Sequence, residues 1–97
     1  MPENDFLDWL VQLELLEPML TPTELRFAGL FGRHLGDWVP RSMLVKMLAH
    51  DPEYSLALYD DGDVRTYVWR LRRKLRDTPW QIQTRPGHGL YRLVHSP

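Results

Sequence analysis

Half of the lysine and arginine residues of this chain lie in one short segment. Residues 65–76, RTYVWRLRRKLR, hold six of the 12 basic residues, although the 97-residue chain has a formal net charge of −1. Guanidinium and ammonium groups neutralise phosphates, and arginine can also pair with guanine through two hydrogen bonds. The chemistry that this segment offers is recognition of a polyanion.

Charge is divided between the two ends of the chain. Residues 1–20 contain five acids and no base, whereas residues 62–97 contain eight bases and two acids. Such a division predicts a basic binding face and an acidic face elsewhere. A solvated surface with a random split of charge is the alternative.

The basic segment has the periodicity of a helix. Its apolar residues follow one another at steps of four, three and four positions, which places them on one stripe: Val64, Val68, Leu71 and Leu75. Asp63 is the expected N-cap, and Asp77-Thr78-Pro79 stops the helix. We therefore predict a helix over residues 63–76 with its basic side chains on the other faces.

Two helices are predicted directly before it, between residues 21 and 50. Thr21-Pro22-Thr23-Glu24 has capping-box spacing with proline at the first helical position, and Gly32 or Gly36 is expected to end that helix. A short extended link at 38–39 leads to a second helix over 41–50, with four residues facing inward: Met43, Leu44, Met47 and Leu48.

The last segment predicts a β-hairpin. In WQIQTRPGHGLYRLV, residues 80–94, apolar and polar residues alternate up to a tight turn at 86–89. Arg85 and His88 lie at its tip. No catalytic motif, metal-ligand spacing or cofactor motif is found, the chain has no cysteine, and no apolar run approaches the length of a membrane span. We expect no enzyme, metal or cofactor, no membrane contact, and a cytoplasmic location.

This order of elements resembles a known family. LTPTELR, RSMLVKML, VRTYVWRLRRKLRD and IQTRPGHGLYRL follow in the order and near the spacing of the OmpR/PhoB-type effector domain of bacterial response regulators, over residues 20 to 94. The resemblance implies an α+β winged helix: a three-helix helix-turn-helix core and a C-terminal β-hairpin wing. It implies a sequence-specific regulator of transcription that binds double-stranded DNA, often as a tandem dimer.

The resemblance also assigns site residues. The recognition helix 63–76 would enter the major groove, with Arg70 reading bases beside Thr66, Tyr67 and Trp69. It places Arg72 and Arg73 of the same helix on phosphates. We expect phosphate contacts from Arg65 and Lys74 as well; for Arg65, which lies near the N-terminus of the helix, an ion pair with Asp61 or Asp63 is the alternative. The wing 80–94 would place Arg85 and His88 on the minor groove. RNA polymerase would contact the loop before this helix, where Tyr54, Leu56 and Tyr59 are candidates, unless these side chains fold back on the core.

The chain departs from the family at its start. The family has a four-stranded sheet before its LTPTE-like motif, but residues 1–19 look helical over 4–16, and the 97 residues hold no phospho-accepting receiver domain. We expect a stand-alone effector domain over 20–97, with 1–19 either packing on the first helix or forming a dimer contact through Phe6, Trp9, Leu10 and Leu13. The alternative function is a winged-helix module that binds RNA polymerase or another regulator without reading DNA.

Overall fold

The computed structural model describes residues 2–49 and 61–95. Over these ranges the chain forms helices and a small antiparallel sheet. In chain order the elements are α1 (Pro2–Leu16), the 3-10 turn η1 (Glu17–Met19), α2 (Pro22–Arg33), β1 (Val39–Pro40), α3 (Arg41–Ala49), α4 (Asp61–Leu75), β2 (Trp80–Arg85) and β3 (Leu90–His95). The predicted helices and hairpin are all present.

The hairpin belongs to a three-stranded sheet in the order β1-β3-β2. β3 is the central strand, since Tyr91 lies opposite Val39 of β1 and opposite Thr84 of β2. The segment at 38–39 was predicted to be extended, but its pairing with β3 was not foreseen. This pairing fixes the start of α3 against the hairpin, because the Arg41 backbone N–H also donates to the Gly89 carbonyl at 2.8 Å.

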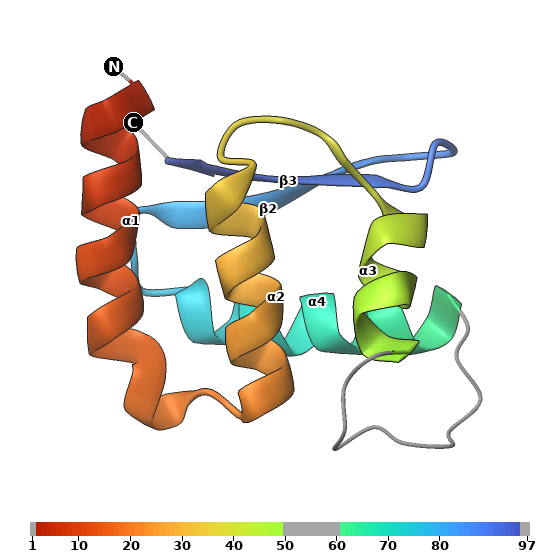
Figure 1. The fold of residues 1–97 in the computed structure, drawn as a ribbon, viewed down its shortest axis with the longest axis horizontal. Helices are drawn as coiled ribbons and strands as arrows, with labels where there is room; N and C mark the ends of the chain where they lie inside the picture. Colours follow the sequence, from red (N-terminus) through yellow and green to blue (C-terminus); the bar gives the residue numbers. More distant parts are fainter. Residues whose placement is uncertain (1, 50–60, 96–97) are drawn as a thin grey trace.

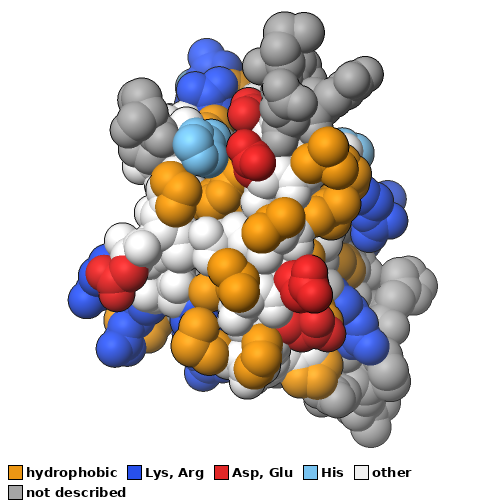
Figure 2. Space-filling view, turned by 90° about the vertical axis from the view of Figure 1, so that its left-hand side faces the viewer, with side chains coloured by type: hydrophobic (Ala, Val, Ile, Leu, Met, Phe, Trp, Pro, Cys, Tyr) orange, Lys and Arg blue, Asp and Glu red, His pale blue; other side chains and the backbone are white. Residues whose placement is uncertain are grey.

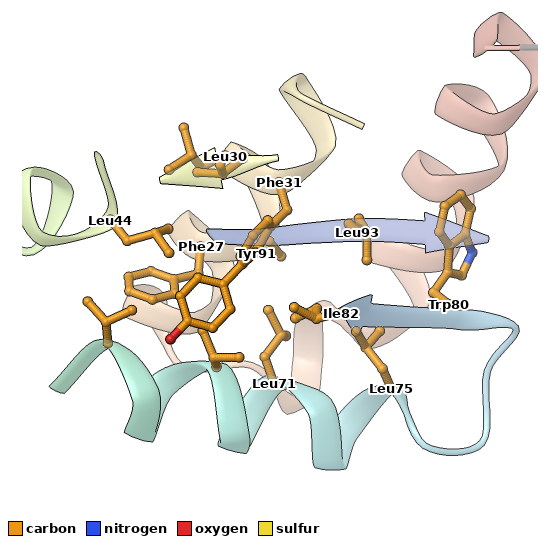
Figure 3. Packing of buried hydrophobic residues seen from close by; sticks show 14 of the residues in the cluster. Phe27, Leu30, Phe31, Leu44, Leu71, Leu75, Trp80, Ile82, Tyr91 and Leu93 are labelled. Atoms are coloured by element: carbon orange, nitrogen blue, oxygen red, sulfur yellow. The ribbon is translucent and has the colours of Figure 1, made fainter. Parts of the chain in front are cut away.

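One core fills the space between α4, the sheet and α2. Figure 1 shows α4 lying across the lower ends of α2 and α3, with the sheet on the upper side. Figure 3 shows Leu71 and Leu75 of α4 pointing towards Ile82 and Leu93 of the hairpin, with Phe27 of α2 alongside. These five side chains are at most 5% exposed, so a single apolar core holds the helices and the wing together.

α1 belongs to this core through two side chains. Trp9 and Leu16 are 1% and 3% exposed, and the Trp9 ring packs edge-on against Trp80 with centroids 5.2 Å apart. The predicted dimer stripe is therefore divided: Trp9 faces the core, whereas Phe6 and Leu10 remain 39% and 43% exposed. A buried Trp9 is not available to a second copy.

Three predicted details of the helices are wrong. α2 does not end at Gly32 or Gly36 but at Arg33, because Gly32 lies inside the helix under Trp9, while Gly36, with φ +82°, lies in the turn that follows. α4 begins at Asp61 rather than 63, so Asp63 is a residue of its first turn and not its N-cap. Met43 was expected to face inward but is 36% exposed.

Candidate nucleic-acid interface

The buried stripe of α4 determines which of its side chains face outward. Val64, Val68, Leu71 and Leu75 are 0–2% exposed, as their spacing predicted. At 100° per residue, the face opposite this stripe is formed by four residues, all of them exposed: Thr66, Trp69, Arg70 and Arg73. The fold therefore presents two arginines, a tryptophan and a threonine together on one surface, which is called the outward face of α4 below.

Two cation–π contacts order this surface. The Arg73 guanidinium carbon lies 4.8 Å from the centroid of the Trp69 ring, and Trp69 is 55% exposed. The Arg70 guanidinium carbon lies 5.4 Å from the centroid of the Tyr67 ring. Stacking on a ring limits the rotamers of an arginine while leaving its N–H donors available for a ligand.

One flank of α4 packs against α2. Tyr67 is half-buried against Phe27, with ring centroids 5.6 Å apart, and the Lys74 ammonium forms a hydrogen-bonded ion pair with Glu24. Tyr67 thus lies at the edge of the outward face rather than within it. Lys74 was expected to contact phosphate, but its ammonium is engaged with a carboxylate of the protein itself.

Glu24 combines that ion pair with the capping box of α2. Its Oε1 accepts from the Thr21 backbone N–H at 2.9 Å, and the Glu24 N–H donates to Thr21 Oγ1 at 3.2 Å, so the predicted capping box is present. Burial would raise the pKa of Glu24, but the hydrogen bonds from Lys74 and Thr21 and the charge of Lys74 outweigh it. They hold the pKa below its ordinary value of 4.5.

The other flank of α4 faces the hairpin. Arg72 Nε donates to the Ile82 carbonyl at 2.9 Å, and Arg72 Nη2 donates to Thr84 Oγ1. β2 is an edge strand, so this arginine satisfies a carbonyl that no neighbouring strand reaches. Arg72 was also expected to contact phosphate, but its guanidinium joins α4 to the wing. Arg65, on the same flank, is exposed.

The wing has the tight turn that its sequence predicts. Gly87 and Gly89 adopt φ of +80° and +60°, a region that glycine enters without strain, and the His88 N–H donates to the Arg85 carbonyl at 3.2 Å. Arg85 and His88 are both exposed at the tip. Figure 1 shows the tip at the same end of the molecule as the start of α4.

The structure adds a basic groove that the sequence did not reveal. The first turns of α3 and the tip of the wing border an open groove of about 570 Å³, lined by Pro40, Arg41, Ser42, Val45, Lys46, His88 and Gly89. The predicted helix 41–50 was assigned only a packing role. The β1–β3 pairing brings its basic residues beside the tip of the wing. This pairing is a long-range contact that no local pattern shows.

The candidate polymerase contacts lie outside the described residues; they are Tyr54, Leu56 and Tyr59. Within residues 2–49 and 61–95, no three histidine, aspartate or glutamate side chains gather in a way that could hold a metal ion. No helix in the described part of the chain is long and apolar enough to cross a membrane.

The helices α2, α3 and α4 followed by the β2–β3 hairpin, with the outward face of α4 basic, define a winged-helix domain. The family described as "Transcriptional regulatory protein, C terminal" matches residues 17–93. The chain therefore belongs to this family, the OmpR/PhoB-type DNA-binding domains of transcription regulators. Comparison with curated proteins and with solved structures found no match.

Proposed function

We propose that this chain binds double-stranded DNA sequence-specifically, with the outward face of α4 in the major groove and the wing on the adjoining minor groove. The observation that supports this most strongly is the arrangement of side chains around α4. One stripe is buried, one flank contacts α2, the other flank contacts the hairpin, and the remaining face is basic and exposed. A B-DNA major groove admits one α-helix, and the 15 residues of α4 span about 22 Å.

Base reading is assigned to the outward face. Arg70 is exposed and stacked at one edge on Tyr67, which directs its guanidinium for a two-hydrogen-bond pair with guanine. Trp69 presents apolar surface on which a thymine methyl could pack. Thr66 lies on the same face, and Tyr67 contributes at its edge.

Phosphate contacts are assigned to exposed basic groups around that face. Arg65 and Arg73 of α4 are exposed, as are Arg85 and His88 of the wing and Lys46 of α3. Arg72 and Lys74 are left out of this set because Thr84 and Glu24 engage them. Each neutralised phosphate releases counterions, so affinity should fall steeply with salt.

Fluorescence anisotropy tests the proposal. A preferred duplex is first selected from a random library, and its binding and that of a scrambled duplex are measured at two salt concentrations. Arg70→Ala should cost about 1–3 kcal/mol on the preferred duplex and little on the scrambled one, whereas Arg73→Ala should weaken both. Equal losses on both duplexes for Arg70→Ala would remove its base-reading role.

The alternative, a module that binds protein without reading DNA, makes the opposite prediction. No salt-sensitive binding to any duplex should then be seen, and selection should enrich no sequence. Arg70→Ala should in that case leave binding to the protein partner intact.

A further inference from the structure

The exposed apolar side chains of this protein are concentrated on one element. Of the eight large hydrophobic residues exposed in the described part of the chain, six lie on α1 and η1. They are Phe6, Leu7, Leu10, Val11, Leu15 and Met19, and they are 39–68% exposed. We refer to them as the outer face of α1. Apolar patches of this kind on a folded domain mark interaction surfaces.

The outer face is held in place by the opposite side of the same helix. Trp9 and Leu16 anchor α1 to the core, and Leu13 packs against it. No rotation of α1 could bury Leu7, Val11 and Leu15 without exposing Trp9. The outer face is thus a fixed feature of the fold, and its side chains are exposed.

The charges around the outer face all have one sign. α1 and η1 carry Asp5, Asp8, Glu14 and Glu17 among their described side chains, and the first basic residue of the chain is Arg26. Figure 2 views this side of the molecule and shows hydrophobic side chains across the surface, acidic ones beside them and basic ones towards the margins. A partner that fits must offer apolar groups with positive charges among and beside them.

This pattern disfavours a second copy of the chain. Two outer faces packed together would bring acidic groups from both copies into one contact with no base on either helix. A specific dimer buries about 800 Å² on each partner, whereas one strip on a helix about 22 Å long supplies only part of that area. Nucleic acid and anionic lipid are repelled by the same carboxylates.

We propose that the outer face of α1 docks a basic, amphipathic helical segment of another protein. Such a segment inserts leucine-like side chains between Leu7, Leu10 and Leu15 and places its lysines or arginines beside Asp8 and Glu14. Figure 1 shows α1 at the end of the molecule opposite the tip of the wing. A partner bound there leaves the wing and the start of α4 free.

Two synthetic peptides test this docking site on the full chain without DNA. Both have about 18 residues and the same leucine positions, long enough to form a helix. One carries lysine at its polar positions and the other glutamate. The lysine peptide should bind roughly tenfold more tightly, and its affinity should fall with salt.

Variants locate the binding. Leu10→Gln combined with Leu15→Gln should weaken the lysine peptide roughly fivefold, and Asp8→Asn with Glu14→Gln should reduce its salt dependence. Met43→Gln, an exposed apolar position on α3, is the matched control and should change nothing. All these side chains except Met43 lie on α1, and all are exposed, so thermal unfolding should show an unchanged fold.

Four results would overturn the proposal. The first is that the lysine peptide does not bind, and the second is that both peptides bind equally well. The third is that Leu10→Gln with Leu15→Gln leaves binding unchanged. The fourth is that a second copy of the chain, rather than a basic segment, occupies the outer face of α1. The last would be seen in sedimentation velocity, as a dimer of the chain alone that Leu10→Gln with Leu15→Gln dissociates. Loss of DNA binding in the anisotropy experiment would leave the peptide result standing, because the two surfaces are separate.

Discussion

Lys74 of α4 and Glu24 of α2 form an ion pair whose carboxylate is almost completely buried. The Glu24 side chain is 2% exposed and that of Lys74 is 30% exposed. The same oxygen, Oε1, also accepts the Thr21 backbone N–H. One carboxylate thus caps α2 and joins it to α4, the helix that we propose enters the major groove.

Removing the lysine should therefore cost more than neutralising the carboxylate. Lys74→Met leaves a buried carboxylate with only the Thr21 N–H, and should reduce the free energy of unfolding by about 2–3 kcal/mol at pH 7. Glu24→Gln should cost about 1 kcal/mol, because glutamine still accepts from Thr21 and Lys74 can turn to water. Urea unfolding of the two variants measures the difference. A larger loss for Glu24→Gln would contradict this ranking.

The same pair predicts the dependence of stability on pH. Because the folded pKa of Glu24 lies below 4.5, its contribution is fully present above pH 4.5 and is lost as pH falls through the folded pKa. In Lys74→Met the lysine no longer offsets the effect of burial, so the pKa of Glu24 rises. Protonation then removes the cost of burying a charged carboxylate. The difference in stability between wild type and Lys74→Met should then narrow as pH falls, starting above pH 4.5 at the raised pKa of Glu24 in the variant and ending at the lower folded pKa of wild type. Urea unfolding at pH 7 and pH 4 measures it, and a constant gap would argue against a charged Glu24 as the cause.

Gly32 should tolerate no side chain while Trp9 is present. A Cβ at Gly32 would lie 2.5 Å from Trp9 Nε1 and 2.6 Å from Trp9 Cδ1, so the indole, which is 1% exposed, would have to shift within the core. Gly32→Ala should destabilise the protein by about 1–2 kcal/mol, as overpacking exceeds the gain in helix propensity.

Gly29 provides the matched control in the same helix. A Cβ there meets no atom within 4 Å, so Gly29→Ala should stabilise by up to about 1 kcal/mol. Combining Gly32→Ala with Trp9→Leu should recover part of the overpacking cost, which a double-mutant cycle of unfolding energies would show. Equal effects of the two alanine substitutions would mean that the contact with Trp9 is unimportant.

The parts of the fold that could be predicted from the sequence depend on local patterns. The capping box needs only the spacing of Thr21 and Glu24, and the inward stripe of α4 needs only residues three and four apart. The turn of the hairpin follows from two glycines. Each of these features is decided within a few residues, so the chain reveals it without a structure.

The features that could not be predicted depend on contacts between distant segments. Gly32 looked like a helix end because its partner, Trp9, lies on another helix. The sequence shows the charges of Arg72 and Lys74 but not their partners Thr84 and Glu24, which lie across the fold. The basic groove beside the wing requires the β1–β3 pairing, which brings Arg41 to Gly89.

Variants of Arg72 and Arg65 should distinguish a residue that supports the wing from one that contacts phosphate. Arg72→Met removes the donors to Ile82 and Thr84, and should reduce the unfolding free energy by about 1–2 kcal/mol. It should also weaken all duplexes alike, because the wing loses two of the hydrogen bonds that position it against α4. Arg65→Met should leave stability nearly unchanged and reduce the slope of log affinity against log salt by about 1. Urea unfolding and salt titrations distinguish the two, and unchanged stability in Arg72→Met would contradict a bracing role.

Trp69 should contribute to specificity through a thymine methyl. Its ring is 55% exposed and is held by Arg73, on a face where every other side chain is polar. The thymine methyl is the apolar group that the major groove offers. Replacing one thymine by uracil in the preferred duplex removes only that methyl, and should weaken binding roughly fourfold at the position that Trp69 contacts.

The Trp69→Ala variant decides whether the effect belongs to this side chain. It should bind the thymine duplex more weakly than wild type and should not distinguish thymine from uracil at any position. Arg73→Ala, which frees the ring without removing it, should retain part of the discrimination while losing affinity for every sequence. If Trp69→Ala still prefers thymine, another residue reads the methyl. If wild type binds both duplexes equally throughout the site, the exposed ring packs against the sugar–phosphate backbone.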